Sequence, residues 1–282
     1  MRIFESKSLL NSYLTPFYDS QTKIGFVPTM GALHSGHLSL LKKSILENEL
    51  TVISIFVNPT QFNNIDDLKK YPRTLDVDVE KISSISDKII VFAPTVDAIY
   101  EGKTISKQFN FDGLEDQMEG KFRPGHFNGV GTVVQRLFEI IKPTTAYFGK
   151  KDFQQLQIVK KLVEKYKLGV RIEGCEIYRE KNGLAMSSRN ERLSVNERDN
   201  AKIIFETLTV VKKLFNTKSV KKISKFVENT FKSNNQFQLE YFEIADEFSL
   251  ISCKRKSKIK KYRAFIAVFV NNIRLIDTIS LY

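Results

Sequence analysis

Between Lys23 and Ile177, short apolar runs alternate with longer stretches of helical period. This alternation is typical of βαβ units that build a parallel sheet with right-handed crossovers. Two helices are well marked, because apolar residues recur on one face over Val130–Ile141 and Leu156–Tyr166. Strands are predicted at five runs: Lys23–Val27, Thr51–Val57, Lys88–Phe92, Thr145–Phe148 and Val170–Ile177.

The pattern changes after about Asn190. The last two strand-like runs there are separated by Asn271-Asn272, which suits a tight hairpin because Asn tolerates positive φ. We therefore expect an α/β protein, with a Rossmann-like parallel sheet in residues 1–177 and a smaller α+β lid domain in residues 178–282. The elements predicted in the second part are helices at Ser194–Phe215 and Val220–Phe231, then strands at Gln238–Ile244, Ala264–Val270 and Ile273–Ile276.

Length and composition narrow the class of protein. A chain of 282 residues is long for a single core, which favours one larger and one smaller domain. Cys175 and Cys253 lie far apart without metal or redox spacing, as expected in a reducing compartment. The first residues lack the pattern of a signal peptide, and the longest apolar run, Ala264–Val270, is too short to span a bilayer. We expect a cytoplasmic protein without a membrane partner.

Charge favours anionic partners. Lys and Arg outnumber Asp and Glu by 44 to 32, which suits phosphates, carboxylates or nucleic acid without choosing among them. The segment 254–263 carries Lys254-Arg255-Lys256-Ser257-Lys258 and then Lys260 and Lys261. We interpret it as a solvated loop or a charge-protected edge strand rather than a nucleic-acid surface. A nucleic-acid-binding protein would instead show salt-sensitive affinity that survives loss of His34 and His37.

The strongest chemical feature is the segment Pro28–His37, which leaves the first strand and enters a helix. In an open parallel sheet, ligands bind at such a junction. Gly31 and Gly36 let the backbone approach a ligand, and the helix offers free N–H groups and a positive dipole end to an anion. His34 and His37, three residues apart, can both donate to phosphate oxygens and so stabilise charge developing on a leaving group.

Two other interpretations of this histidine pair are open. A lone histidine would be taken as structural, but the pair, the glycines and the junction agree with one another. Histidines at i and i+3 can also share a metal ion, although only His126 and the two distant cysteines could complete such a site.

The motif His34-Ser35-Gly36-His37 resembles the HxGH motif of the nucleotidyltransferase superfamily, which indicates ATP chemistry but not the substrate. Further blocks make the chain similar, in order and spacing, to the pantothenate synthetase (pantoate–β-alanine ligase) family. The resemblance implies ATP-dependent condensation of (R)-pantoate with β-alanine through a pantoyl adenylate, giving pantothenate, AMP and pyrophosphate. The six blocks are Pro28–His37, Ser54–Phe62, Tyr71–Leu75, Met118–Val130, Phe148–Leu156 and Gly183–Asn190.

The resemblance also implies roles for individual residues. His37 would be the catalytic residue, and Gln61 and Gln155 would contact pantoate, with Gln61 later contacting β-alanine. Lys151 would meet the phosphates, and Tyr178 would meet adenine through its main chain. The ATP-binding residues implied are Met30, Gly31, Ala32, Leu33, His34, Ser35, Gly36, His37, Gly149, Lys150, Lys151, Asp152, Tyr178, Met186, Ser187, Ser188 and Arg189.

Local sequence leaves plainer alternatives for several of these residues. Gln61 could cap the turn after its strand, and Asp152 is as well suited to cap the next helix as to accept from ribose. Met186–Arg189 could be a polar linker before the helix at Ser194. The family commonly has an acidic residue where this chain has Lys150, which weakens that one contact.

Magnesium is expected, because attack at the α-phosphate of ATP needs charge neutralised on the departing group. By resemblance Asp78 is a candidate ligand, although Val77 replaces a neighbouring acid that some relatives carry; in isolation Asp76 and Asp78 look like surface carboxylates opening a helix. The block Met118–Val130 should form a flap that excludes water from the adenylate. Family members pair as homodimers through the N-terminal domain. The nearest rival is a nucleotidyltransferase that keeps the nucleotide on its product, which AMP release would exclude.

Overall fold

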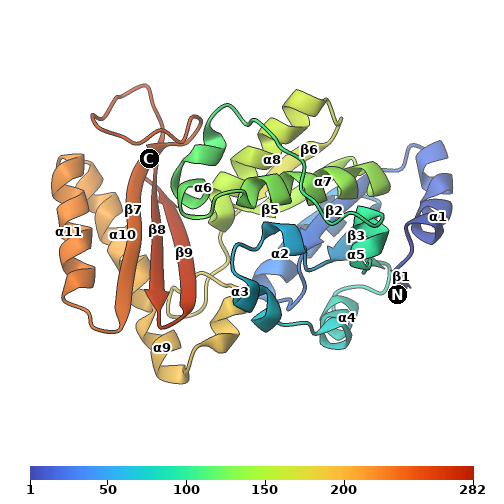
Figure 1. Ribbon diagram of the computed structural model, residues 1–282, viewed down its shortest axis with the longest axis horizontal. Helices are drawn as coiled ribbons and strands as arrows, with labels where there is room; N and C mark the ends of the chain where they lie inside the picture. The colour runs from blue at the N-terminus through green and yellow to red at the C-terminus, as the bar shows by residue number, and fades with distance from the viewer.

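The computed structural model describes residues 1–282 as two packed bodies, each built on its own sheet (Figure 1). The larger body holds a six-stranded sheet in the order β1-β4-β3-β2-β5-β6, in which every neighbouring pair is parallel. The smaller body holds the antiparallel sheet β7-β8-β9. The predicted fold class is confirmed. The strands of the larger sheet are β1 (Arg2–Phe4), β2 (Ile24–Thr29), β3 (Leu50–Ile55), β4 (Ile90–Phe92), β5 (Thr145–Gly149) and β6 (Arg171–Cys175).

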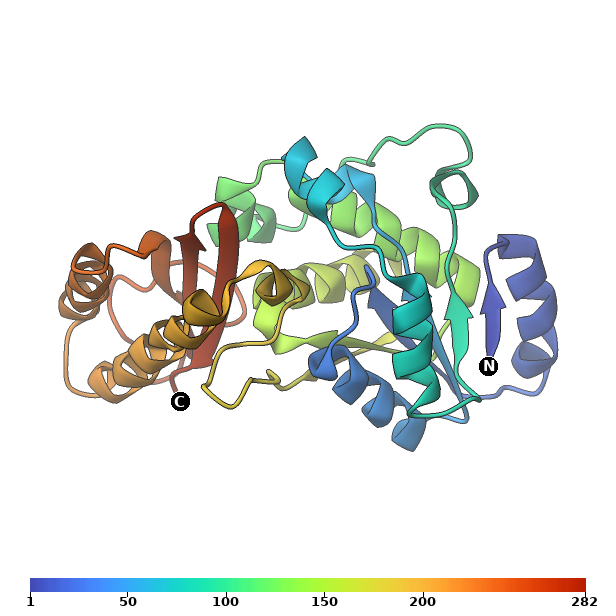
Figure 2. The ribbon, with the colours of Figure 1, turned by 90° about the horizontal axis from the view of Figure 1, so that it is seen from below.

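Helices cover both faces of the parallel sheet, which is why its inner strands β2 to β5 are largely apolar and buried, whereas the edge strand β6 carries Arg171 and Glu173. In β2, Ile24 and Phe26 join the core under α1, α7 and α8, whereas Val27 joins the core under α2 and α4. Figure 2 shows the blue α2 and the green α7 on opposite sides of the sheet. The helices of this body are α1 (Lys7–Asp19), α2 (Ser35–Glu47), α3 (Ile65–Lys70), α4 (Leu75–Ser83), α5 (Val96–Tyr100), α6 (Met118–Phe122), α7 (His126–Ile141) and α8 (Phe153–Tyr166), with short 3-10 turns η1 (Pro59–Gln61), η2 (Leu114–Asp116) and η3 (Lys150–Asp152).

The smaller body packs its sheet between its own helices and the larger body. Its core of 19 buried residues runs from Leu184 to Leu281. The opposite face of the sheet contributes Phe265 to the core of the larger body, where its ring lies 6.0 Å from that of Phe153 at the start of α8. The elements are η4 (Ser188–Arg192), α9 (Val195–Asn200), α10 (Lys202–Phe215), α11 (Val220–Lys232), β7 (Phe237–Asp246), β8 (Tyr262–Val270) and β9 (Ile273–Ser280).

All eight predicted strands are present, with shifted ends, and Asn271 turns the β8–β9 hairpin at φ 49° as expected. The single helix predicted over Ser194–Phe215 is wrong, because the chain breaks at Ala201 into α9 and α10. The polar α9 buries no residue and is held by a capping box from Ser194 to Glu197, whereas α10 carries the apolar face.

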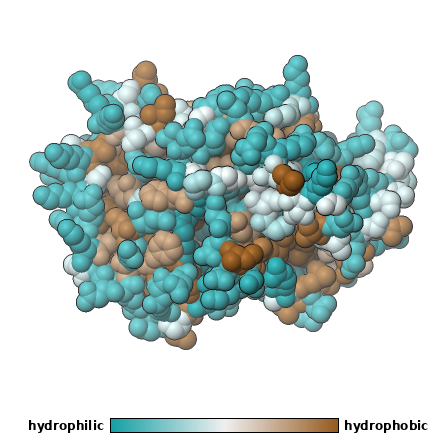
Figure 3. Space-filling view, in the orientation of Figure 1, coloured by the Kyte–Doolittle hydropathy of each residue, from teal (hydrophilic) through white to brown (hydrophobic).

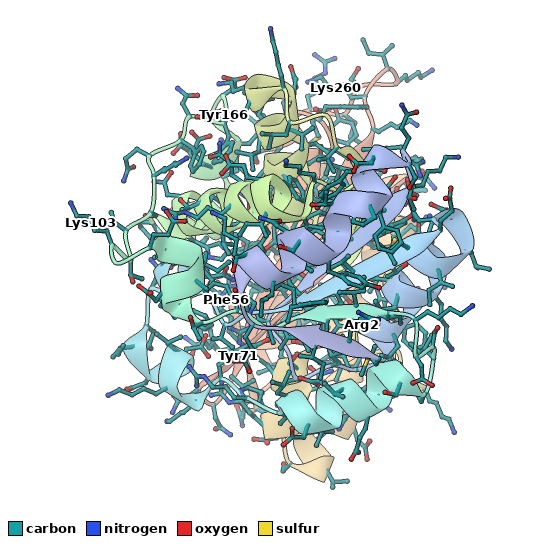
Figure 4. The ribbon with its side chains drawn as sticks, turned by 90° about the vertical axis from the view of Figure 1, so that its right-hand side faces the viewer. Arg2, Phe56, Tyr71, Lys103, Tyr166 and Lys260 are labelled. Carbon is teal, nitrogen blue, oxygen red and sulfur yellow. The ribbon has the colours of Figure 1, made fainter.

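The lysine-rich segment forms an exposed loop between β7 and β8. Lys256 reaches back and donates to the carbonyls of Phe215 and Lys218 at the end of α10. In Figure 4 the side chains of Lys103 and Lys260 point away from the molecule, while Phe56 lies inside it. The face seen in Figure 3 is mostly hydrophilic, with scattered apolar residues. No helix has both the length and the apolarity that crossing a bilayer requires.

Candidate active site

The site lies where the order of the parallel sheet changes direction. From β2 the chain continues to β3 on one side, while β5 pairs with the other side of β2. Helices after such diverging strands leave a crevice at the carboxyl ends, where ligands of open α/β sheets bind. Here β2 leads into the loop before α2, and β5 leads into η3 and α8. The segments Pro28–His37 and Gly149–Asp152 are thereby brought side by side.

Asp78 holds the loop after β2 in its strained course. Gly31 and Ala32 both have positive φ, at 80° and 49°. The Asp78 carboxylate accepts from the backbone N–H groups of Ala32 at 2.8 Å and Leu33 at 2.6 Å. Asp78 is fully buried, so the expectation of a surface carboxylate is wrong. One carboxylate fixes two amides that no helix or strand would otherwise satisfy.

The same geometry bears on the predicted magnesium site. Both Asp78 oxygens are engaged by backbone amides, and one also accepts from the Thr74 hydroxyl at 3.3 Å. No group of three His, Cys, Asp or Glu side chains is placed to hold a metal ion. The residues present therefore do not form a protein-built magnesium cage, and Asp78 fits a structural role better than a ligand role.

His34 and His37 stack on the first turn of α2, with ring centroids 4.0 Å apart. His34 is the N-cap, and its Nδ1 accepts from the N–H of Gly36 at 3.1 Å. This bond leaves the proton of a neutral His34 ring on Nε2. The Nδ1 of His37 is buried and has no hydrogen-bond partner in the protein.

Both rings are neutral near pH 7. Burial, reinforced by the charge of Lys151, lowers the pKa of His34 to about 4. Burial also holds the pKa of His37 well below its usual range, with His34, Lys151 and Lys81 adding to the effect. Neutral imidazoles donate hydrogen bonds without carrying charge, so the pair is suited to stabilising a developing oxyanion and poorly suited to delivering a proton.

A cavity of about 180 Å³ opens beside this pair. It joins the ends of β2 and β5 to the chain after β6 and to the segment that enters η4. Thirteen of the predicted site residues line it: Met30, His34, Gly36, His37, Gly149, Lys151, Asp152, Gln155, Tyr178, Met186, Ser187, Ser188 and Arg189.

The other predicted residues, besides Asp78, lie outside this lining. Ala32, Leu33 and Ser35 line an adjoining cavity of about 490 Å³. Lys150 is absent from the lining and pairs with Glu176, which does line the cavity. Gln61 contacts Met30 of the lining, with its Nε2 3.1 Å from the Met30 sulfur. Gly31 is buried at the turn, where a Cβ would lie 3.1 Å from Asp78.

The segment Met186–Arg189 touches the loop after β2 directly. The Ser188 hydroxyl donates to the carbonyl of Ala32 at 3.0 Å. Ser187 caps η4 by accepting from the N–H of Arg189, so the N-cap interpretation also describes the segment. The Arg189 guanidinium pairs with Asp67 of α3 at 2.7 Å. Two hydroxyls and a guanidinium thus converge on the rim of the cavity.

Asp152 does not cap α8. It occupies the N-cap position, but its side chain makes no capping hydrogen bond. Its carboxylate lies 3.4 Å from the Lys151 ammonium and lines the cavity. The carbonyl of Tyr178, across the cavity, accepts from the N–H of Met186 at 3.0 Å. A carboxylate free to accept from hydroxyl groups therefore stands at the mouth of the cavity.

Gln61 is held at both its side chain and its backbone. Asn58 donates to its Oε1 at 3.1 Å. Its carbonyl accepts from Nδ1 of His126 at 2.8 Å and from Arg123 at 3.3 Å. His126 is thereby engaged away from the stacked pair, which argues against the three-histidine metal site considered from the sequence. Gln155, in contrast, makes no side-chain hydrogen bond and faces the cavity.

A larger cleft of about 500 Å³ continues from the cavity between the two bodies. The two spaces share Lys151, Asp152, Ser187 and Arg189. Sequence reasoning missed Tyr71, a buried ring on the cavity wall, although it belongs to one of the six blocks. It also assigned no individual role to the charged side chains that the smaller body and the predicted flap Met118–Val130 bring to the cleft, namely Glu119, Arg123, Glu240 and Arg274.

Comparison with known proteins places this site in one family. The family model described as Pantoate-beta-alanine ligase matches residues 2–280. The pantothenate synthetases of Flavobacterium psychrophilum and Christiangramia forsetii are 65% and 52% identical over 281 residues, covering 100% of this chain and 100% and 99% of theirs.

Solved structures agree in fold over the whole chain. Pantothenate synthetase from Thermus thermophilus is 34% identical, with a TM-score of 0.91 and 100% of both chains covered. Pantoate-beta-alanine ligase from Francisella tularensis, complexed with beta-gamma ATP and beta-alanine, is 33% identical with a TM-score of 0.81, covering 100% of this chain and 98% of that one. The chain belongs to the pantoate–β-alanine ligase family.

Proposed function

We propose that this chain condenses (R)-pantoate with β-alanine at the expense of ATP, through a pantoyl adenylate, and releases pantothenate, AMP and pyrophosphate. The family assignment supports this reaction along the whole chain. The observation that carries the assignment of roles is the cavity beside His34 and His37. There, neutral hydrogen-bond donors, a lysine, two serines and an arginine surround one space that opens into a cleft for the second substrate.

In the first step, a carboxylate oxygen of pantoate attacks the α-phosphorus of ATP. A bond from that oxygen to phosphorus forms, and the bond from phosphorus to the bridging oxygen breaks, so pyrophosphate leaves with the electron pair. We assign His37 to the charge that develops at this centre and His34 to the phosphates beside it. Lys151 and Arg189 supply positive charge around the departing group.

In the second step, the amine of β-alanine attacks the acyl carbon of the adenylate. The bond from this carbon to the phosphate oxygen breaks, AMP leaves, and the nitrogen gives up a proton as the amide forms. We assign Gln61 and Gln155 to pantoate, since an amide both donates to and accepts from hydroxyl and carboxylate oxygens. Asp152 is assigned to ribose, because its carboxylate lines the cavity and caps no helix.

The remaining nucleotide contacts are assigned to residues that line the cavity beside His34. We assign Met30, Gly36, Gly149, Met186, Ser187 and Ser188 to ATP, and Tyr178 to adenine through its main chain. Magnesium stays a prediction; it would neutralise phosphate charge and would arrive on the oxygens of ATP, since Asp78 is occupied by the loop. Lys150 is not assigned a contact, because it pairs with Glu176.

Three properties of the whole chain are also proposed. The boundary between the two domains is placed at residues 177 and 178, supported by the separate core that begins at Leu184. The chain is proposed to form a homodimer through its N-terminal domain, which sedimentation at several protein concentrations tests. A cytoplasmic location stays a prediction.

The reaction is tested by measuring AMP release with ATP, magnesium, pantoate and β-alanine, leaving out each component in turn. The expected result is AMP formation that needs both organic substrates. Product that retains the nucleotide would favour the nucleotidyltransferase rival instead. Exchange of labelled pyrophosphate into ATP with pantoate alone, without AMP release, would keep the adenylation step and require a different amine.

The role of His37 is tested by His37→Ala. Loss of one oriented donor to developing charge typically lowers kcat by about 10²-fold or more. A kcat within about tenfold of wild type would remove His37 from the assigned role. Thermal unfolding of the variant shows whether the fold is kept.

A further inference from the structure

An ion-pair network joins the smaller body to α6 across the cleft. Arg274 of β9 grips the carboxylate of Glu119 with both arms of its guanidinium, at 2.7 and 2.8 Å. Its Nε donates to Glu240 at 2.8 Å, and the hydroxyl of Tyr241 donates to Glu119 at 2.7 Å. The Arg274 and Glu119 side chains are only 17% and 11% exposed. Paired in this forked geometry, the two charges fix the orientation of each other.

The network continues from Glu119 to the backbone of Gln61. Arg123 lies between them, with one nitrogen 3.5 Å from Glu119 and the other donating to the Gln61 carbonyl at 3.3 Å. His126 supports the same carbonyl at 2.8 Å. Burial, with the charge of Arg123, lowers the pKa of His126 to about 3, so its ring is neutral and Nδ1 donates its one proton here.

Two guanidiniums share the carboxylate of Glu119, and Arg274 makes the shorter contacts. Arg274 occupies both carboxylate oxygens, and the contact from Arg123 to Glu119 is correspondingly long. Without Arg274, a desolvated carboxylate would draw its remaining cationic neighbour closer. Arg123 would then move away from the Gln61 carbonyl. By pairing with Glu119, the guanidinium of Arg274 thus leaves Arg123 able to donate to the carbonyl of Gln61.

Attachment of α6 does not itself require Arg274. The backbone N–H of Glu119 donates to Gln154 of α8 at 2.9 Å. Gln154 in turn donates to the carbonyls of Leu114 and Gln117 at 2.8 and 2.9 Å. The segment before α7 is therefore fastened to its own body, and the contact with β9 acts on the side chains.

We propose that Arg274 is a positioning residue for the organic substrates, acting through Glu119 and Arg123 on Gln61. The inference rests on the proposed role of Gln61 in contacting pantoate. It makes the smaller domain part of the pantoate site, although Arg274 is the partner of a carboxylate and not of the substrate. Placement of the lid and capture of pantoate are then coupled through one guanidinium.

The test is steady-state kinetics of Arg274→Gln with ATP and pantoate varied in turn. The KM for pantoate should rise by about tenfold or more while the KM for ATP stays within about twofold, because only one substrate loses its positioned contact. Arg274→Lys keeps the positive charge but loses the forked pairing. Its KM for pantoate should therefore lie between those of the wild type and Arg274→Gln. If Arg274→Gln does not fold, the lysine variant supplies the same comparison of KM values.

A double-mutant cycle with Glu119→Gln checks that Arg274 acts through Glu119. The two substitutions should change the KM for pantoate non-additively, since each breaks the same path. Arg263→Gln is the matched control. Arg263 is also a buried guanidinium of the smaller body, paired with Glu247 at 2.9 Å and lying over the Phe153 ring, and it does not contact Gln61 or its supports. Its loss should lower thermal stability and leave the KM for pantoate unchanged.

Gln61→Ala separates this inference from the role on which it rests. If Gln61→Ala leaves the KM for pantoate unchanged, the assigned role of Gln61 fails and the positioning proposal falls with it. If Gln61→Ala raises that KM while Arg274→Gln raises neither KM, or raises both equally, only the positioning proposal is overturned. Additive effects in the double-mutant cycle would also overturn it.

Discussion

At the scale of single residues, the histidines are notable for being uncharged. All three histidines of the chain are buried enough, or close enough to cations, for the pKa to be lowered. A pair of imidazolium ions stacked at 4.0 Å would repel one another and the nearby Lys151. The free enzyme therefore presents His34 and His37 to ATP as dipoles, and the attraction for phosphate charge comes from lysine and arginine.

This arrangement predicts how the histidines titrate. In the free enzyme, NMR signals of the imidazole ring should shift near pH 4 for His34 and near pH 3 for His126, with His37 also below its usual range. Because the folded pKa lies below the unfolded one, the folded state binds fewer protons, and stability falls as pH drops from about 6.5 through 4. An inflection near pH 6.5 for either stacked ring would contradict the prediction.

Asp78→Asn tests the structural role of the buried carboxylate. An amide offers one oxygen in place of two, so one of the backbone N–H groups of Ala32 and Leu33 loses its acceptor. The free energy of unfolding should fall by about 1–3 kcal/mol, and the KM for ATP should rise because the loop beside His34 loosens. Denaturant unfolding and kinetics measure the two effects.

Asp76→Asn is the matched control for Asp78→Asn, since Asp76 is exposed on the same helix. This substitution should change neither the free energy of unfolding nor the KM for ATP. A direct ligand of magnesium would behave differently from a loop support. Unchanged stability together with activity restored by excess magnesium would show that Asp78 acts on the metal and would refute the structural role.

At the scale of elements, the packing of α7 against η1 sets where Gln61 stands. Gly129 lies at this contact, and a Cβ added there would come within 2.4 Å of the Thr60 carbonyl and 2.7 Å of the Gln61 Cα. Backbone atoms cannot swing aside as a side chain can. The helix and the turn therefore approach as closely as they do because position 129 has no side chain.

We expect Gly129→Ala to displace η1 and to lower kcat/KM for pantoate by about tenfold or more, as a shift of about 1 Å near a site commonly does. Gly131→Ala is the control on the same helix. The atoms nearest to its added Cβ belong to the rings of Phe109 and Phe111, at 3.0 to 3.1 Å, and not to η1. If both variants kept wild-type kinetics, the close contact at η1 would not be what positions Gln61.

The elements also show which parts of the fold the sequence could predict. Strands buried on both faces are largely apolar, so β2 to β5 stand out in the sequence. Helix α1 does not, because Pro16 lies inside it and interrupts the pattern, and β1 has only three residues. Helices of five or six residues, such as α5 and α6, are too short to display a helical period.

For the site, local motifs were enough to predict most of the residues that line the cavity beside His34. They could not reveal the pairing of Glu119 with Arg274, because those residues are separated by 155 positions and Arg274 belongs to none of the six blocks. Burial of Asp78 was missed for a related reason. A carboxylate at the start of a helix looks like a surface residue until the loop that it holds is folded over it.

At the scale of the whole molecule, the Glu119 network should shape the response to acid. Burial alone would raise the pKa of Glu119, but the hydrogen bonds and charge of Arg274, with Arg123 and Tyr241, lower it to about 2. Since the folded pKa is the lower one, the stabilisation is present above about pH 4.5 and is lost as pH falls toward 2.

Glu119→Gln should therefore flatten the acid side of the stability profile. Urea unfolding at several pH values between 2 and 6 measures the slope, with Glu240→Gln as a comparison on the same network. The wild type should lose stability more steeply than Glu119→Gln over that range. Identical slopes would mean that Glu119 is protonated at the same pH in the folded and unfolded chains.

The buried Nδ1 of His37 has no hydrogen-bond partner in the protein, so this side chain lowers the stability of the fold while serving catalysis. A buried polar atom without a partner costs a protein about 1–3 kcal/mol, so His37→Phe should make the chain more heat-resistant while lowering kcat by about 10²-fold or more. Directed evolution for thermal tolerance alone would favour losing this imidazole. A library of this protein therefore has to be selected for growth on its product and for heat survival in the same round.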